Sequence, residues 1–320
     1  MTFFRIAIPI ALLLLALVAL RGAEGAEGDK VSTWTDPKQA REARSEFSVQ
    51  GEYVQRGKDA AIGLQVADMD GGKFHVLRYS GGLPGDGWDG SSIKASLLTH
   101  EEVESLIEGF QRVQRSSPTL GQVAPAGAMV IFDGEKTEHI QGEIEGGLLW
   151  AGSKMITPVG DFQLHVEFRL PYKPSRPLSH QDRGNSGLYI FDNYEVQILD
   201  SFGLDFDTEN NAIPTVSLNA QWCGSFYKEK TPDVPMAFPP LAWQTYDIEF
   251  TAPKFEGDEK VSNARVTVKH NGVVIHEGVE LKKGTGAGGK RPEKAKGPIQ
   301  FQGHGNPVAF RNVWVLPKNS

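Results

Sequence analysis

The 320-residue chain has a single cysteine, Cys223. This excludes an intrachain disulfide, a CxxC redox pair and a zinc site built on several thiolates. Long basic tracts are also lacking, and the formal net charge is −7, so binding of nucleic acid along a broad surface is not expected. No GxSxG, HExxH or P-loop pattern occurs, which argues against serine hydrolases, zincins and P-loop nucleotide-binding enzymes.

Long apolar runs are confined to the start of the chain. Residues 6–20 are uncharged and apolar over 15 positions, which is short for a bilayer span of about 20 residues. Arg5 precedes the run, and small residues follow it. We therefore expect residues 1–25 to be a cleaved signal peptide and the protein to be secreted or periplasmic, with an uncleaved N-terminal anchor as the alternative.

Glycine is abundant, with 36 residues, and 39% of the chain is hydrophobic. This composition favours a packed, turn-rich β protein. Residues 26–115 read as a small α+β region with strands at 61–66 and 73–79. Thr99 and Glu102 have the spacing of a capping box, and apolar residues at helical spacing predict that the helix continues to Val113.

A linker is expected at 116–127, and the signals in 128–320 are all β. Strict alternation over 162–170 predicts a half-buried strand, and Asn271-Gly272 predicts a hairpin turn. Further strands are expected at 188–191, 194–199, 243–250, 264–269, 273–275, 299–302 and 308–315. With no helices between them, these strands predict an antiparallel β-sandwich.

The strand at 194–199 offers the clearest candidate site. Side chains alternate along a strand, so Tyr194 points into the sandwich while Glu195 and Gln197 point together to the other face. A carboxylate and an amide on an open sheet face suit a ligand rich in hydroxyl groups. Asp200 falls at the strand end and can turn to either side. The alternative is a solvated outer face with ordinary polar residues.

Two glycines precede this strand and bear on the same site. Gly184 and Gly187 allow the backbone to approach a ligand closely.

A second polar motif is the Gln302-Gly303-His304-Gly305-Asn306-Pro307 sequence. A histidine between two glycines is either a turn residue or an exposed acid, base or ligand, since its pKa lies near neutrality. If the fold brings His304 next to Glu195, the two form an acid–base couple.

Acidic residues also alternate at Asp205, Asp207 and Glu209. Oxygen ligands at this spacing can bind calcium, but the glycine of an EF-hand loop is absent and a solvated loop is favoured. A divalent ion such as calcium therefore stays open as a cofactor. The basic stretch at 282–298 reads as a solvated loop.

Taken together, these motifs resemble the 3-keto-disaccharide hydrolase domain family. The resemblance covers about residues 128–317 and is carried by 160–169, 183–201, 243–248, 264–268, 271–273, 297–299, 304–308 and 310–315. It implies a concanavalin A-like jelly roll, and action on glycosides that a partner sugar 3-oxidoreductase has oxidised at C3. The polar concave-face positions that it implies are Arg183, Asn185, Glu195, Gln197, Asp200 and His304.

The chemistry of such a substrate agrees with these residue types. A ketone at C3 acidifies the hydrogen at C2, so a base can remove it, the C1 substituent departs by elimination, and water adds afterwards. We assign Glu195 or His304 as the base, and Arg183 or a divalent ion to the enolate oxygen. Substrate binding is assigned to Asn185, Gln197, Asp200 and Asn306.

Three other functions remain open at this stage. A non-catalytic carbohydrate-binding sandwich would use the same polar face without turnover, and a structural or adhesion module would bind no sugar. An ordinary laminarinase-type glycosidase requires paired carboxylates, and Gln197 stands in the middle of the 195–200 segment where that pattern has an acid.

Overall fold

The computed structural model describes residues 32–57, 61–91, 93–178, 180–204 and 220–318. Residues 33–320 form one compact unit. The expected signal peptide and the acidic segment at 205–211 lie outside the described residues. Within the described part of the chain, no helix is long and apolar enough to cross a membrane.

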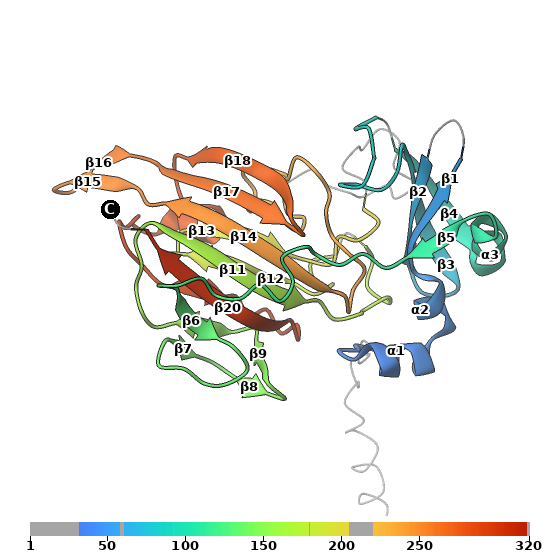
Figure 1. Cartoon of the computed structure of the whole chain (residues 1–320), viewed down its shortest axis with the longest axis horizontal. Coiled ribbons are helices and arrows are strands. Elements are labelled where there is room, and N and C mark those ends of the chain that lie inside the picture. The colour runs from blue at the N-terminus through green and yellow to red at the C-terminus, as the bar shows by residue number, and fades with distance from the viewer. Residues whose placement is uncertain (1–31, 58–60, 92, 179, 205–219, 319–320) are drawn as a thin grey trace, which may run out of the picture. The chain divides into compact units, whose positions relative to one another are not determined.

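The N-terminal region is built on a five-stranded antiparallel sheet in the order β4-β3-β2-β1-β5. The strands are β1 (Gly51–Arg56), β2 (Ala61–Asp68), β3 (Lys73–Ser80), β4 (Lys94–Thr99) and β5 (Gln111–Val113). Its small core joins Leu64, Val66, Phe74 and Val76 of the sheet to Val103 of helix α3 (His100–Ile107). The α+β character predicted for this region is confirmed (Figure 1).

Helix α3 begins as predicted and ends earlier. Thr99 caps it, and the reciprocal bonds with Glu102 form the expected capping box. The prediction that it continues to Val113 was wrong, because the helix ends at Ile107 and Val113 lies in β5, opposite Glu52. Two short helices, α1 (Pro37–Ala43) and α2 (Ser45–Val49), also precede the sheet.

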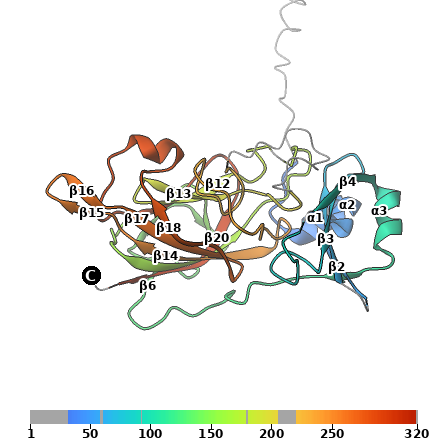
Figure 2. The ribbon, with the colours of Figure 1, turned by 90° about the horizontal axis from the view of Figure 1, so that it is seen from above.

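The C-terminal region is an antiparallel β-sandwich, as predicted. One sheet, here called the site sheet, has the order β13-β12-β19-β10-β7. Its strands are β7 (Ile140–Gln141), β10 (Ser153–Met155), β12 (Ser186–Ile190), β13 (Tyr194–Ile198) and β19 (Ile299–Phe301). Figure 2 shows β12 and β13 in a layer separate from β14 and β20.

The second sheet, here called the back sheet, has the order β18-β17-β14-β11-β20-β9-β8, with β6 also paired to β20. Its strands are β6 (Met129–Phe132), β8 (Ile144–Glu145), β9 (Leu148–Trp150), β11 (Phe162–Arg169), β14 (Trp243–Thr251), β17 (Ala264–His270), β18 (Val273–Leu281) and β20 (Ala309–Pro317). A hairpin of β15 (Lys254–Glu256) and β16 (Glu259–Ser262) and a 3-10 helix, η2 (Gly286–Lys290), complete the described elements.

The main core lies between these two sheets. Phe162, Leu164, Val166 and Phe168 of β11 face Leu188, Ile190, Val196 and Ile198 of the site sheet within one apolar cluster. Asn271 and Gly272 have φ of 51° and 80°. These left-handed values are those of the tight hairpin turn expected from the sequence.

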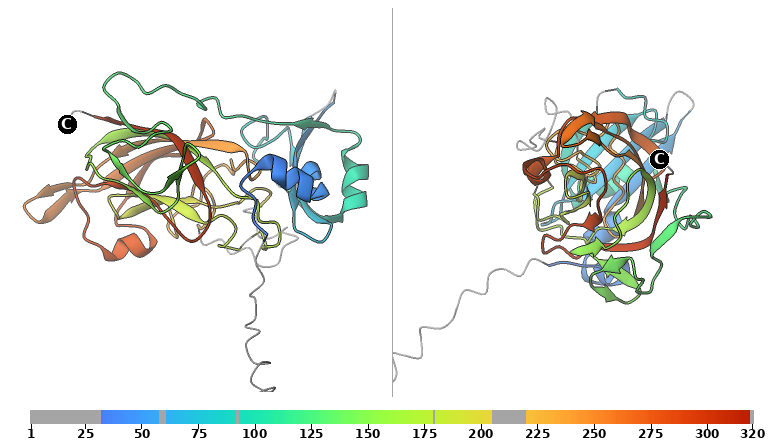
Figure 3. Two further views of the ribbon diagram at one scale, coloured as in Figure 1. Left: turned by 90° about the horizontal axis from the view of Figure 1, so that it is seen from below. Right: turned by 90° about the vertical axis from the view of Figure 1, so that its left-hand side faces the viewer.

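The segment expected as a linker, 116–127, runs along the outer side of the back sheet (Figures 2 and 3). The Ser117 hydroxyl lies 2.6 Å from that of Thr245, and the Gly121 N–H donates to Glu167 at 2.5 Å. Hydrogen bonds therefore fix this segment to the strands that it crosses.

Candidate functional site

Strand β13 presents its side chains as the alternation predicts. Tyr194, Val196 and Ile198 belong to the core between the sheets. Glu195 and Gln197 therefore lie on the opposite, outer face of the site sheet. Both are nonetheless buried, with 3% and 0% of their surface exposed, so this face is covered rather than open to solvent.

Strand β12 and the residue after β19 bring polar groups to the Glu195 carboxyl. Tyr189 of β12 is the direct cross-strand partner of Glu195, and its phenol hydrogen-bonds to the carboxyl. The amide of Gln302, which follows β19, makes a second hydrogen bond to Glu195. The phenol of Tyr227, which is half-buried, has a pKa raised by burial and then by the nearby Glu195 charge.

Burial controls the protonation of this carboxyl. Loss of solvent raises the pKa of Glu195 from 4.5 to about 7, although the hydrogen bonds from Tyr189 and Gln302 act in the opposite direction. Burial, followed by the neighbouring Glu195 charge, raises the pKa of Tyr189. A carboxyl that is partly ionised near neutrality, beside a protonated phenol, can accept and return a proton.

Two amide oxygens beside the carboxyl have no hydrogen-bond partner within the described residues. They are Gln197 Oε1 and Gln302 Oε1, and both are buried. The Gln197 amide nitrogen is engaged, at 3.3 Å from Gln181 Oε1 and 3.4 Å from Asn185 Oδ1. Buried polar atoms are nearly always paired in folded proteins, so these two oxygens are suited to accept hydrogen bonds from a ligand's hydroxyl groups.

Gly187 has no side chain, and the Glu195 carboxylate occupies the space that a side chain at this position would fill. A Cβ atom at position 187 would lie 2.7 Å from Glu195 Oε1 and 3.3 Å from Gln302 Oε1. The glycine was predicted to allow close approach of a ligand to the backbone, and its observed neighbour is the carboxylate itself.

Arg183 and Asp200 form a buried ion pair, with Nε 2.7 Å from Oδ2. The other guanidinium nitrogens donate to the carbonyls of Arg176 at 2.7 Å and Asp68 at 3.1 Å. With 1% and 0% exposure, this pair holds the 171–183 loop and the end of β2 together. The geometry differs from the expectation that Arg183 faces an enolate oxygen and Asp200 a substrate.

The Gly303–Asn306 turn divides into an exposed and a buried part. His304 is exposed, and no hydrogen bond joins its imidazole to Glu195 among the residues described. Asn306 is buried, and its Oδ1 accepts from Lys173 Nζ at 2.8 Å. Tyr189 is a proton-carrying neighbour of Glu195 in this structure, and the acid–base couple of His304 with Glu195 stays a prediction.

Tyr189 and Gln302 lie within the two polar motifs, but sequence reasoning gave them no role, and it missed Gln181. The signal for Tyr189 was present, because the strands at 188–191 and 194–199 were both expected. Pairing them as a hairpin through the short turn at 191–193 places residue 189 opposite residue 195.

The oxygen donors around Glu195 are one carboxylate and the amide oxygens of Gln197 and Gln302, which is fewer than the six to eight oxygen ligands that calcium takes. In the described ranges, no group of three or more His, Cys, Asp or Glu side chains is arranged to hold a metal. The 205–209 segment, for which a solvated loop is expected and calcium binding is the alternative, lies outside the described residues.

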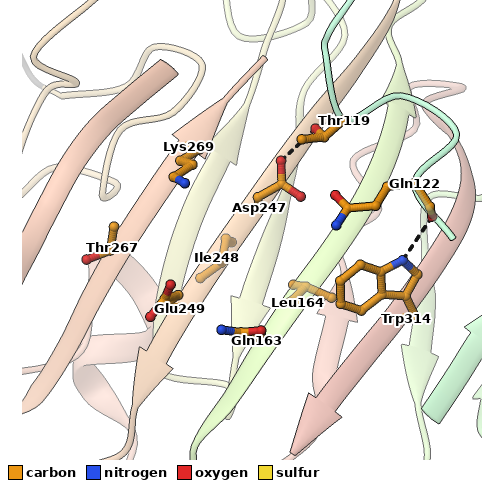
Figure 4. A pocket seen from close by; sticks show the side chains of 10 residues that line it. All are labelled: Thr119, Gln122, Gln163, Leu164, Asp247, Ile248, Glu249, Thr267, Lys269 and Trp314. Atoms are coloured by element: carbon orange, nitrogen blue, oxygen red, sulfur yellow. Dashed lines mark hydrogen bonds between the residues drawn. The ribbon is translucent and has the colours of Figure 1, made fainter. Parts of the chain in front are cut away.

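The outer face of the back sheet carries a second polar cluster that sequence reasoning also missed. His165 Nδ1 lies 2.6 Å from Asp247 Oδ1, and His165 Nε2 lies 3.7 Å from Glu167 Oε1. Figure 4 shows the adjoining pocket of about 240 Å³, where Thr119 bonds to Asp247 and the Gln122 carbonyl accepts from Trp314. The Asp247 and Trp314 side chains hold the 116–127 segment through these two hydrogen bonds.

Two solved structures from Parabacteroides distasonis are similar to this chain. A solved structure of a candidate glycosyl hydrolase from Parabacteroides distasonis has a TM-score of 0.52 and 28% identity, covering 69% of this chain and 97% of that chain. A second candidate glycosyl hydrolase from the same organism has a TM-score of 0.43 and 16% identity, with coverage of 60% and 95%. Comparison with curated proteins gives no match.

One family model matches most of this chain. The model for the 3-keto-alpha-glucoside-1,2-lyase-like domain matches residues 104–316, a range that begins within α3, upstream of the expected start near 128. It spans more than half of the chain and includes every residue placed around Glu195. The chain belongs to the 3-keto-alpha-glucoside-1,2-lyase-like domain family.

Proposed function

We propose that this protein is a carbohydrate-active enzyme that cleaves glycosides bearing a ketone at C3, by proton transfer at the outer face of the site sheet. One observation carries the proposal: the Glu195 carboxyl, with a pKa raised to about 7, lies beside the Tyr189 phenol and two unpaired amide oxygens. The family assignment supplies the substrate class, and the similar Parabacteroides protein supports action on a glycoside.

In the proposed reaction, ionised Glu195 removes the proton at C2, which the neighbouring ketone has acidified. The electron pair forms the enolate, and the C1–oxygen bond then breaks to leave an unsaturated ketone. The departing oxygen takes a proton from Tyr189 or from protonated Glu195, and water adds to the unsaturated product in hydrolysis. Raising the pKa of a base toward neutrality increases its strength while keeping part of it ionised at working pH.

The remaining polar groups would orient the sugar. Gln197 Oε1 and Gln302 Oε1 accept hydrogen bonds from ring hydroxyls, and the nearby Asn185 amide can donate to an oxygen. Preorganised donors and acceptors of this kind position the C2 hydrogen against the base. His304, exposed on its turn, remains a candidate for contact with the leaving group.

We also propose a pathway partner and a cellular location for the protein. A sugar 3-oxidoreductase would supply the ketone, because the proposed substrate is a glycoside already oxidised at C3. The apolar start of the chain supports export as a secreted or periplasmic protein.

The test is incubation of the purified protein with 3-keto-trehalose and with unoxidised trehalose, with and without chelator, followed by product mass. Release of 3-keto-glucose or its unsaturated precursor only from the oxidised sugar is expected. Glu195→Gln should abolish turnover and Tyr189→Phe should lower it by about 10²-fold or more, while Glu256→Gln on the exposed β15 should match the wild type. Full activity in Glu195→Gln would rule out the proposed base.

The alternative is a carbohydrate-binding module that uses the same unpaired amides. It predicts that 3-keto-trehalose binds and is recovered unchanged.

A further inference from the structure

A cavity of about 550 Å³ lies at a part of the molecule that shares no residue with the Glu195 site. Its walls come from α1, the start of β1, β5 with the two residues that follow it, and the loop before β14. This volume lies within the range of pockets that hold small organic ligands.

Positive charge predominates in this cavity. Its lining includes one carboxylate, Glu52, and four cationic side chains: Lys38, Arg41, Arg112 and Arg115. The whole chain, by contrast, has a formal charge of −7. A concave surface of this sign attracts anions in preference to cations.

The single carboxylate is neutralised within the wall. Glu52 is 2% exposed, and its two oxygens lie 2.5 Å from Arg115 Nη2 and 2.7 Å from Arg115 Nε. The Arg115 guanidinium also packs over the Phe238 ring, 5.0 Å from its centroid. The charges of Lys38, Arg41 and Arg112 are therefore left for a ligand.

Arg112 is fixed in place without an acidic partner. Its Nη1 and Nη2 donate to the carbonyls of Ser48 and Gln50, each at 2.6 Å. Carbonyls orient the guanidinium but leave its charge uncompensated, so an anion that binds here gains attraction without first ordering this side chain.

The two remaining cations are on α1 and are exposed. Arg41 has no hydrogen-bond or ion-pair partner within the part of the chain that the structure describes. Lys38 Nζ lies 3.9 Å from Glu42, and both side chains are largely exposed, so this pair holds Lys38 only weakly.

The rest of the wall combines apolar side chains with Gln50 and Gln114. Phe47 and the loop residues Pro239, Pro240 and Leu241 line the cavity next to the cations. An inorganic anion would use the charges and leave this surface idle, whereas a sugar ring offers both hydroxyls and apolar C–H faces.

We infer that this cavity binds an acidic saccharide, a sugar of one to three units that carries carboxylate or sulfate groups. The charged groups of the ligand would face Arg41, Arg112 and Lys38, and its ring faces would lie against the proline-rich loop. The inference is independent of the reaction proposed at Glu195 and assigns the N-terminal region a binding role.

The test is titration calorimetry of the full protein with trigalacturonic acid, and with maltotriose as a neutral saccharide of equal length. Trigalacturonic acid should bind and weaken with added salt, while maltotriose should show no binding at the same concentrations. Arg41→Ala and Lys38→Ala should each weaken binding about tenfold, and Arg78→Ala, an exposed arginine on β3, should leave it unchanged.

Parallel titrations separate the sources of negative charge. Sulfated trisaccharides are expected to bind at the same residues. Absence of trigalacturonate binding, or binding unaffected by Arg41→Ala and Lys38→Ala, would overturn the inference. Equal or tighter binding of inorganic phosphate or of a pentaglutamate peptide would also overturn it. Glu195→Gln should bind trigalacturonate like the wild type. The binding experiment therefore tests this inference separately from the turnover experiment at Glu195.

Discussion

At the scale of single residues, the burial of Glu195 links the candidate chemistry to stability. The carboxyl is held next to Tyr189 and Gln302 in a place that favours its neutral form. A surface glutamate would be a weaker base at the same pH. Burial of the Glu195 carboxyl therefore makes it a stronger base and, when the group is ionised, also lowers the free energy of unfolding.

Glu195→Gln should therefore be more thermostable than the wild type at about pH 8 and nearly equal to it at about pH 5. The folded-state pKa is raised, so the stability contributed by this group is complete below pH 4.5 and lost as the pH rises through about 7. This loss of unfolding free energy amounts to roughly 3 kcal/mol. The neutral glutamine amide does not ionise and so does not lose it. Melting temperatures of both proteins across this range check the prediction; an equal loss at both pH values would contradict it.

Gly187→Ala should lower kcat/KM for the 3-keto substrate by about tenfold or more while changing the melting temperature little. The new methyl group would lie 2.7 Å from Glu195 Oε1 and so displace the carboxyl from its position. Gly160→Ala is the matched control, because its nearest neighbour would be 3.7 Å away. Unchanged kinetics in Gly187→Ala would show that the carboxyl position is not critical.

At the scale of elements, the segment at 116–127 is attached to the back sheet through charged groups. Burial opposes ionisation of Glu167, but bonds from His165, Asn312, the Gly121 N–H and Arg311 lower its pKa to about 2. Burial likewise acts to lower the pKa of His165, yet Asp247 and Glu167 outweigh it and raise the value above 6.5.

These shifts define a pH window for the attachment. Glu167 contributes stability above pH 4.5 and loses it toward pH 2, while His165 contributes fully below pH 6.5 and loses its share as the pH rises through its raised pKa. Between these limits Glu167 holds the Gly121 N–H, and His165 supports Glu167 and Asp247, the two carboxylates that bond to the segment.

Glu167→Gln should accordingly increase elastase cleavage near Val123 several-fold at about pH 6. Val123 is already 84% exposed, so access depends on how firmly the flanking residues are held. Glu249→Gln is the control, since Glu249 lies on the same sheet and pairs with Lys318 instead. Equal cleavage in both variants would show that Glu167 does not hold the segment.

Elements that follow from side-chain periodicity could be predicted, and those set by distant contacts could not. Strands β11, β13 and β14 follow from alternation, and the β17–β18 turn follows from Asn271-Gly272. The end of α3 did not follow, because Val113 fits the helical spacing equally well and lies in a strand only through its pairing with Glu52. The roles expected for Arg183 and Asp200 likewise depended on contacts with Arg176 and Asp68 that no local pattern reveals.

At the scale of the whole molecule, the N-terminal sheet and the sandwich share buried polar bonds. The Tyr172 phenol donates to the buried carboxyl of Asp68, at the end of β2. Arg183 donates to the Asp68 carbonyl, and Trp34 and Tyr172 exchange backbone hydrogen bonds. Residues 33–318 are therefore expected to unfold as one cooperative unit rather than as two domains.

Tyr172→Phe should lower stability by about 1–3 kcal/mol while leaving a single unfolding transition in which fluorescence and circular dichroism coincide. The loss should exceed that of Tyr53→Phe, whose hydroxyl bonds to the Val49 carbonyl within the N-terminal region. Two separate transitions in the wild type would contradict the expectation of one unit.

The position of the Gln122 carbonyl matters for protein engineering. The Gln122 carbonyl accepts from both Asn312 and Trp314, and every amino acid carries the same carbonyl. Position 122 can therefore accept a fluorophore-bearing or tagged residue without losing this contact, whereas inserting or deleting a residue between 117 and 122 would shift the carbonyl out of register with both donors. Length, and not composition, is what a library built on this stretch must preserve.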